Sequence, residues 1–422
     1  MKKLLVLEVA ALGYALLRRA GVEQVAGLPI QPLKPAFPAV TCTAQATLRT
    51  GLAPEAHGMP ANGRFFRETN SVAFWNQSAA LVKGARIWEP FRARGGRVGL
   101  YFFQQSLGEA VDEVLSPAPI HTHSGGMIMA TYQQPEGMLK RKNPIPLWRY
   151  WGPLASPNVG WGIVKAVQER LESGSAPEWM MVYLPTLDYD LQRFGTRHRR
   201  SARALEMALA QIEALAATAR AKGYAVAVKG DYAIRDVSGP VVYPNRVLRE
   251  AGFFATRPVK QMRYPDFYRS RAVAVCDHQA ALIYCREAAC KETVRACLAG
   301  CQGVAQVHEG PGGEGPDWIL EAQAGAWFAW PWWHARQEAP DYAVHVDIHN
   351  KPGFDPCELF FGRVPWHVSQ AAERIRGTHG GVEGEACAVA LASEVPVGEV
   401  GSVQEWVQAL AREMNKGASF QG

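Results

Sequence analysis

Apolar runs too short for helices alternate with amphipathic segments along the first half of the chain. Because these runs lack alternating polar residues, they are typical of parallel strands that helices cover on both faces. Residues 199–221 carry apolar side chains along one helical face and end just before Gly223, which predicts an amphipathic helix. The pattern predicts an α/β fold with a mostly parallel sheet. The expected strands are residues 3–8 (KLLVLE), 98–103 (VGLYFF), 179–184 (WMMVYL) and 224–229 (YAVAVK).

Residues 245–335 follow a different pattern. Short strand-like runs, tight turns and one helix near 288–300 succeed one another there, which predicts a small α+β lobe. We therefore expect residues 1–244 and 336–422 to form one large α/β core, with residues 245–335 inserted into it as a cap.

Two further segments complete the outline. Residues 403–415 predict a closing helix. Residues 104–160 are rich in Pro, Gly and aromatic side chains without a clear period, and we interpret them as ordered loops.

The charge balance and the cysteines narrow the class of protein. Lys and Arg number 45 against 39 Asp and Glu, and the net charge of +6 is scattered, which argues against a nucleic-acid polymer as partner. The eight cysteines include no CxxC pair, so we interpret them as reduced thiols. Glu8 interrupts the apolar N-terminal run, and that run is too short to span a bilayer. We expect a cytoplasmic protein without a membrane span, and the sequence leaves its oligomeric state open.

Three acidic residues follow or end the expected strands. Glu8 ends the first, Asp188 follows the third after a short turn, and Asp231 comes directly after the fourth. Ligands of open α/β sheets bind beyond the carboxyl ends of the strands, so these acids are candidates for a site. Carboxylates that converge repel one another, and bound divalent cations are the usual solution. For each acid alone, a helix or turn cap is an equally good interpretation.

Thr41 lies where an extended Pro-rich segment meets an expected helix that begins near Thr43 and ends at Gly51. A hydroxyl at the positive end of a helix can have its developing alkoxide stabilised, and the backbone N–H groups there bind phosphate. The junction is therefore a candidate nucleophile site.

The segment around Thr41, PAFPAVTCTAQATLRTGLAPEAHGMPANG, resembles the nucleophile segment of the type I phosphodiesterase and nucleotide pyrophosphatase family, in the alkaline phosphatase superfamily. Three later segments follow in the family's order: YLPTLDYDLQRFG at 183–195, VKGDYAIRDV at 228–237 and RGTHGG at 376–381. The resemblance spans most of the chain. It implies a three-layer alkaline-phosphatase-like core that carries an inserted lobe.

The resemblance also implies roles for individual residues. Thr41 would be the nucleophile and form a covalent phospho-enzyme. Asp188 and His379 would bind one divalent metal ion, and Glu8, Asp231 and Thr41 a second, with zinc as the family expectation. Two such cations polarise the phosphoryl oxygens and stabilise the leaving oxygen.

The chain departs from the family pattern at several of these positions. Gln192 and Tyr232 stand where the family has histidines, Glu8 replaces an Asp, and Ala44 replaces an Asn that helps to hold a phosphate oxygen. An oxygen-rich ligand set that includes Gln192 and Tyr232 suits Mg²⁺ or Mn²⁺ better than zinc. The residues expected at the substrate are Ala44, Asn62 and Lys351.

The function that the resemblance implies is a metal-dependent phosphoester hydrolase acting on a small phosphorylated substrate. Two alternatives stay open. The first is a catalytically silent member that binds a phosphorylated or cyclitol-like ligand, because histidine ligands are missing. The second is a phosphomutase or phosphotransferase, in which an alcohol replaces water as the acceptor.

Two other groups of residues have structural and functional interpretations. We interpret Asp277 and His278 as structural residues of the inserted lobe rather than as a catalytic pair. The aromatic run WFAWPWWH at 327–334 favours core packing, with a pocket wall as the alternative.

Overall fold

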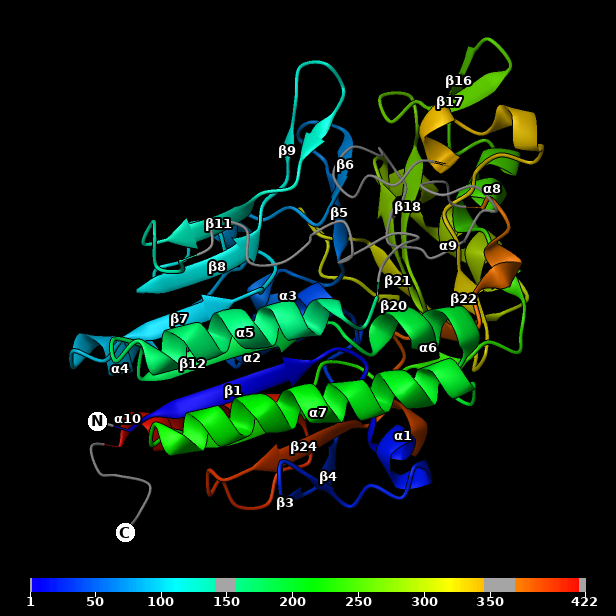
Figure 1. Ribbon diagram of the computed structural model, residues 1–422. Helices are drawn as coiled ribbons and strands as arrows, with labels where there is room; N and C mark the ends of the chain where they lie inside the picture. Colours follow the sequence, from blue (N-terminus) through cyan, green and yellow to red (C-terminus); the bar gives the residue numbers. More distant parts are fainter. Residues whose placement is uncertain (1, 141–155, 345–368, 417–422) are drawn as a thin grey trace.

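The computed structural model describes residues 2–140, 156–344 and 369–416 (Figure 1). Its central sheet has eight strands in the order β11-β8-β7-β12-β1-β13-β24-β4. The five strands from β8 to β13 in this order are parallel, and β11, β24 and β4 pair antiparallel at the two edges. The strands are β1 (Leu4–Val9), β4 (Gln31–Leu33), β7 (Val98–Tyr101), β8 (Glu113–Pro117), β11 (Thr131–Gln134), β12 (Trp179–Leu184), β13 (Ala225–Gly230) and β24 (Val389–Ser393).

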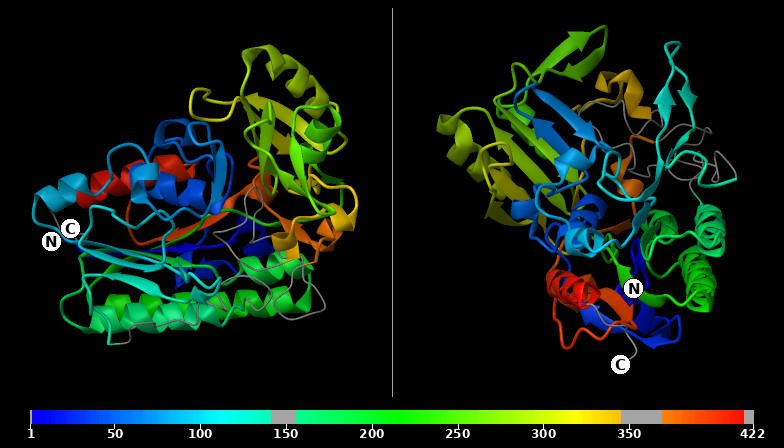
Figure 2. Two further views of the ribbon diagram at one scale, coloured as in Figure 1. Left: turned by 90° about the horizontal axis from the view of Figure 1, so that it is seen from above. Right: turned by 90° about the vertical axis from the view of Figure 1, so that its left-hand side faces the viewer.

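Helices cover both faces of this sheet. Helices α5 (Val159–Glu172) and α7 (Arg199–Ala221) lie side by side on one face. Helices α2 (Thr41–Thr50) and α10 (Val403–Asn415) pack together on the other, as the view from above shows (Figure 2). The predicted three-layer α/β fold with a mostly parallel sheet is therefore confirmed. The amphipathic helix and the closing helix have the predicted bounds.

Residues 272–322 contain a second sheet, antiparallel and four-stranded, in the order β18-β19-β21-β20. Helices α8 and α9 pack beside it, and the whole segment lies to one side of the central sheet (Figure 1). The division into a core and an inserted cap stays a prediction. The elements are α8 (Pro244–Glu250), β18 (Ala272–Asp277), β19 (Ala280–Cys285), α9 (Lys291–Ala299), β20 (Val304–Glu309) and β21 (Trp318–Ala322).

Short elements connect these two sheets and their helices. The short helices are α1 (Tyr14–Arg19), α3 (Pro54–His57), α4 (Glu89–Ala93) and α6 (Asp188–Phe194). The short strands are β2 (Gln24–Val25), β3 (Leu28–Pro29), β5 (Gly63–Phe66), β6 (Ser71–Phe74), β9 (Ile120–His121), β10 (Met127–Ile128), β14 (Arg235–Asp236), β15 (Val241–Val242), β16 (Thr256–Val259), β17 (Met262–Pro265), β22 (Trp327–Phe328) and β23 (Gly377–Thr378). Within the described part of the chain, no helix combines the length and apolar character that crossing a membrane requires.

The aromatic run at 327–334 belongs to the hydrophobic core. Trp327, Trp330, Trp332 and Trp333 are all buried. Trp330 packs edge-on against Phe74 of β6, with ring centroids 5.2 Å apart. The core-packing interpretation of this run is confirmed.

Strands β8 and β11 correct the interpretation of residues 104–160 as loops, of which residues 141–155 lie outside the described residues. Both β8 and β11 belong to the central sheet. The β8 sequence is short and begins with Glu113, so its pattern does not resemble an apolar strand. The structure also begins α2 at Thr41 rather than at Thr43.

Glu113 is buried in β8 because cationic and phenolic donors surround its carboxylate. Arg170 of α5 donates two hydrogen bonds, of 2.5 and 3.0 Å, and the Tyr101 hydroxyl donates one of 2.6 Å. Arg97 adds a fourth contact of 3.1 Å. The charged network ties α5 to the edge of the sheet that the sequence pattern does not reveal.

Replacing Glu113 by Ala leaves the Arg170 guanidinium buried without its carboxylate. We expect the free energy of unfolding of Glu113→Ala to be lower than that of the wild type by about 3–5 kcal/mol, measured by urea unfolding. Glu172→Ala, which removes an exposed carboxylate from the same helix α5, should change it by less than about 0.5 kcal/mol. Equal effects of the two substitutions would contradict a stabilising role for the network.

Candidate functional site

The three acids predicted at strand ends lie together at the carboxyl ends of three central strands of the large sheet. Glu8 is near the carboxyl end of β1, Asp231 follows β13 directly, and Asp188 begins α6 after β12. Strands β12 and β13 flank β1 and run parallel to it, so their carboxyl ends meet. We call Glu8, Asp188 and Asp231 the acidic cluster.

Glu8 forms an ion pair with a lysine of the neighbouring strand. Lys229 lies directly opposite Glu8 in the β1–β13 register, and side chains at one register position of adjacent strands point to the same face. The Lys229 Nζ donates to Glu8 Oε1 at 2.5 Å, and both side chains are fully buried. No described residue hydrogen-bonds to Glu8 Oε2. The charge of Glu8 is therefore compensated by the chain itself.

Asp231 is held by backbone donors. Its Oδ1 accepts hydrogen bonds from the backbone N–H of Ala11 (3.0 Å) and of Tyr232 (2.7 Å). Its Oδ2 is buried and has no partner in the described parts of the chain. Burial, followed by the nearby Glu8 carboxylate, raises the pKa of Asp231 well above its usual range.

Asp188 accepts hydrogen bonds from two side chains. Gln192, one helical turn later on α6, donates through Nε2 to both carboxylate oxygens, at 2.8 and 3.0 Å. The Tyr232 hydroxyl donates to Asp188 Oδ1 at 2.9 Å. Burial raises the pKa of Asp188 to about 6, although these two hydrogen bonds act to lower it. Burial and the Asp188 carboxylate likewise raise the pKa of Tyr232 well above its usual range.

Thr41 is the first residue of α2 and lies next to this cluster. Val40 is extended (φ −133°, ψ 161°) and marks the end of the Pro-rich lead-in. The first turn of a helix leaves backbone N–H groups without intrahelical acceptors, which suits an anion at this position. The Thr41 side chain lies within reach of the Tyr232 hydroxyl and acts to lower its pKa, against the larger effect of burial, which raises it.

His379 fixes the lead-in to Thr41 and contacts two other rings. Its Nδ1 hydrogen-bonds to the Ala39 carbonyl at 2.9 Å. Its ring stacks on Tyr232, with centroids 3.7 Å apart and planes at 8°, and the His278 ring lies 4.0 Å away at 34°. Burial and His278 lower the pKa of His379 well below its usual range, and burial lowers the pKa of His278 to about 4. Both imidazoles are therefore neutral near pH 7.

Two of the three residues expected at the substrate lie beside Thr41. Asn62 Oδ1 accepts from the Cys42 N–H at 2.9 Å, which uses one of the free donors of α2. Asp277 in turn accepts from the Asn62 backbone N–H (2.7 Å) and Nδ2 (3.1 Å). Ala44 is buried in the first turn of α2. Lys351 lies outside the described residues.

Three residues near the acidic cluster are absent from the predicted set. Lys229 has a visible signal, since a lysine inside the apolar run YAVAVKG is unusual for a buried strand. Asp277 and His278 lie at the β18–β19 turn, and they contact Asn62 and His379. Only the tertiary structure brings this turn to the edge of the central sheet, so no local pattern identifies it.

The acidic cluster does not fit a pair of divalent cations. Lys229 is already in contact with Glu8, and the donors Gln192 and Tyr232 point at Asp188, where a cation would need free oxygens. An amide N–H or a phenol O–H that points at a carboxylate is a substitute for a cation and not a ligand to one. Over the described residues, no group of three or more His, Cys, Asp or Glu side chains is arranged to hold a metal ion.

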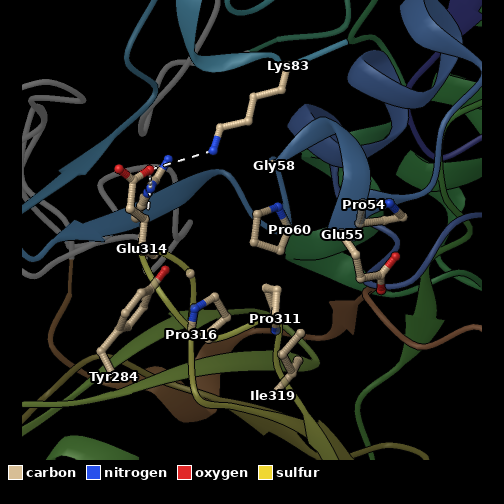
Figure 3. A pocket seen from close by; sticks show the side chains of 13 residues that line it. Pro54, Glu55, Gly58, Pro60, Lys83, Tyr284, Pro311, Glu314, Pro316 and Ile319 are labelled. Atoms are coloured by element: carbon tan, nitrogen blue, oxygen red, sulfur yellow. Dashed lines mark hydrogen bonds and ion pairs between the residues drawn. The ribbon is translucent and has the colours of Figure 1, made fainter.

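A hollow of about 170 Å³ lies apart from these residues, between the α3–β5 segment and the turn that joins β20 to β21 (Figure 3). Glu314 of that turn forms ion pairs with Arg64 (3.3 Å) and Lys83 (3.6 Å). None of the predicted site residues lines the hollow. Its lining is largely apolar and includes Pro54, Pro60, Tyr284, Pro311, Pro316 and Ile319.

Comparisons with known proteins agree with this architecture. The family model described as type I phosphodiesterase / nucleotide pyrophosphatase matches residues 26–355. No curated protein matches the chain.

Two solved structures illustrate the similarity of fold. Murine ectonucleotide pyrophosphatase / phosphodiesterase 5 is 12% identical, with a TM-score of 0.60, and the match covers 98% of this chain and 95% of that one. An inactive threonine-to-alanine variant of the murine protein was determined in complex with AMP. Phosphonoacetate hydrolase from Sinorhizobium meliloti, in complex with phosphonoacetate, is 14% identical, with a TM-score of 0.62 over 98% of this chain and 96% of that one.

His57 supports helix α2 and is a buried titratable group. Its Nε2 contacts the Thr47 hydroxyl of α2 at 3.1 Å, and its Nδ1 accepts from the Met59 N–H at 3.2 Å. Burial and the charge of Arg49 lower the pKa of His57 to about 3. The unfolded chain therefore takes up a proton at this residue below pH about 6.5, and the folded chain does not.

The stability of the wild type should consequently fall as the pH drops from 6.5 towards 3. Between pH 6.5 and pH 5.0 we expect it to lose about 2 kcal/mol more free energy of unfolding than His57→Gln, which lacks this titration. Urea unfolding at the two pH values gives both differences. Identical losses in the two proteins would show that His57 does not cause the acid sensitivity.

Proposed function

Because the chain belongs to the type I phosphodiesterase / nucleotide pyrophosphatase family, we propose that it hydrolyses small phosphoesters with Thr41 as the nucleophile. The observation that carries this proposal is the position of Thr41 at the first residue of α2. Its hydroxyl lies beside Tyr232 and at the end of a helix whose free N–H groups suit phosphate oxygens.

The chemistry follows from the placement of the Thr41 hydroxyl beside Tyr232. Its Oγ1 attacks phosphorus, so that the Oγ1–P bond forms as the bond from phosphorus to the leaving oxygen breaks. The proton of Thr41 passes to Tyr232, which donates its own to Asp188 Oδ1. The N-terminal N–H groups of α2 stabilise the charge on the phosphoryl oxygens. Water then cleaves the phosphothreonine ester and restores the hydroxyl.

The expected substrate is a small phosphorylated molecule. The structures with AMP and with phosphonoacetate support this substrate class, because both ligands present a tetrahedral phosphorus group on a small organic frame. No step of the proposal uses a metal ion, since Lys229, Gln192 and Tyr232 already hydrogen-bond to Glu8 and Asp188.

A second candidate is a catalytically silent protein that binds such a ligand. The specific observation in its favour is that Lys229, Gln192 and Tyr232 already hydrogen-bond to the Glu8 and Asp188 carboxylates. A carboxylate that is fully hydrogen-bonded to its own chain contributes little to the activation of a nucleophile. The silent binder and the hydrolase predict the same affinity for a phosphorylated ligand and differ in turnover.

The first test removes the nucleophile. We expect Thr41→Ala to lose hydrolysis of bis(4-nitrophenyl) phosphate or 4-nitrophenyl phosphate by at least about 1,000-fold in kcat. Thr50→Ala, which removes a threonine hydroxyl from the other end of α2, should keep wild-type turnover. Acid-quenched wild-type protein should carry a phosphoryl group on Thr41 by mass spectrometry.

Full turnover by Thr41→Ala would overturn the mechanism. If the wild type hydrolyses neither substrate nor a wider panel of phosphoesters, yet binds AMP in isothermal titration calorimetry, the silent binder is the correct function.

The second test removes the proposed proton path. Tyr232→Phe keeps the ring that stacks on His379 and loses the hydroxyl between Thr41 and Asp188. We expect kcat to fall by about 100-fold or more, with little change in AMP affinity. Tyr224→Phe, which removes a buried hydroxyl bonded to the Pro177 carbonyl, is the matched control. A loss of affinity with unchanged kcat would assign Tyr232 to ligand binding instead.

A further inference from the structure

Buried carboxylates need compensation, and the structure shows what compensates two of those in the acidic cluster. A carboxylate taken out of water costs several kcal/mol unless a cation or hydrogen-bond donors replace its hydration. Glu8 has the ammonium of Lys229 at 2.5 Å, and both side chains are fully buried. The chain therefore places a lysine side chain in contact with Glu8 at the position between β1 and β13.

The contact between Glu8 and Lys229 is set by the backbone and not by chance side-chain placement. The two residues are partners in the parallel register, so both side chains leave the sheet on the same face. Lys229 Nζ occupies the oxygen of Glu8 that it contacts, and a divalent ion that bound at this carboxylate would have to approach the ammonium against its charge.

At Asp188, neutral donors take the corresponding role. Gln192 Nε2 reaches both carboxylate oxygens and the Tyr232 hydroxyl reaches one of them. The i, i+4 spacing of Asp188 and Gln192 on α6 places both on one helical face. Tyr232 follows Asp231 directly and donates to Asp188, so one phenol links the two ends of the cluster.

We propose that Lys229, Gln192 and Tyr232 take the place of divalent cations, so that this site binds its phosphorylated ligand without a metal ion. The inference rests on the proposed function only in taking the acidic cluster as the ligand site. It assigns Lys229 as the positioning residue whose ammonium balances the charge of Glu8 between β1 and β13. The unpartnered Glu8 Oε2 and Asp231 Oδ2 are the oxygens that a cation would use if Lys229 were absent.

The first measurement is metal content. Full-length protein purified without chelator should contain far less than one equivalent of zinc, manganese and magnesium by plasma mass spectrometry. Its thermal midpoint should be the same in EDTA and in excess MnCl₂ or ZnCl₂, because a ligand that does not bind the folded state does not stabilise it. One or more equivalents of metal, or a midpoint lowered by EDTA, would overturn the inference.

The second measurement creates the cation site. Lys229→Ala removes the ammonium and leaves Glu8 and Asp231 buried together, so we expect its thermal midpoint to rise by several degrees when MnCl₂ is added. Calorimetric titration with MnCl₂ should give one equivalent bound. Lys222→Ala, which removes an exposed lysine after α7, should show neither effect.

A double variant provides the control for folding. Glu8→Gln combined with Lys229→Met removes both charges, and we expect it to fold equally well with and without MnCl₂. If Lys229→Ala is soluble only when MnCl₂ is present, the result supports the inference. If Lys229→Ala is folded and binds no MnCl₂, Lys229 does not occupy the place of a cation and the inference fails.

These outcomes are independent of catalysis. A metal-free wild type that hydrolyses no phosphoester would overturn the hydrolase and leave the inference standing. A metal-containing wild type that hydrolyses phosphodiesters through Thr41 would support the hydrolase and overturn the inference of a metal-free site.

Discussion

The parallel register of β1 and β13 is the constraint on which the arrangement of the site depends. It sets Glu8 opposite Lys229 at the carboxyl end of the sheet and ends β13 at the residue before Asp231. Tyr232 then follows at the position from which its hydroxyl reaches Asp188 and its ring covers His379. A one-residue slip would turn Lys229 to the opposite face, leave Glu8 buried as an uncompensated charge and move the phenol away from Thr41.

Much of the fold can be predicted from the sequence because hydrophobic period and strand ends are local properties. The central strands, the long helix α7 and the closing helix α10 follow from apolar runs and amphipathic periods. Strand β8 cannot be predicted in this way, because its Glu113 is buried through contacts with Tyr101 and with Arg170, which lies on a helix far along the chain. Acids at strand ends identify the candidate site at the carboxyl ends of the strands, and Thr41 is a candidate because it lies at the junction of an extended segment and a helix.

The hydrogen-bond and ion-pair partners of these residues cannot be predicted from the sequence, because they depend on long-range contacts. A lysine in a strand indicates a buried charge pair but does not say with which residue, and Gln192 is compatible with both a ligand and a donor. Only its Nε2 contacts with Asp188 distinguish the two. The neutral imidazoles of His278 and His379 likewise result from burial that no sequence pattern displays.

Three consecutive residues at the turn between β18 and β19 contact two segments of the candidate site, one at Asn62 and one at His379. Asp277 accepts hydrogen bonds from Asn62 on the side of helix α2, while His278 packs on His379 and the Gln279 N–H donates to the His379 carbonyl at 2.7 Å. Gly380, the residue after His379, has φ 122°, and a Cβ there would lie only 3.1 Å from the Gln279 backbone nitrogen. The antiparallel sheet thus holds Asn62 and His379 through a single turn, so their separation depends on the position of that sheet as well as on the central sheet.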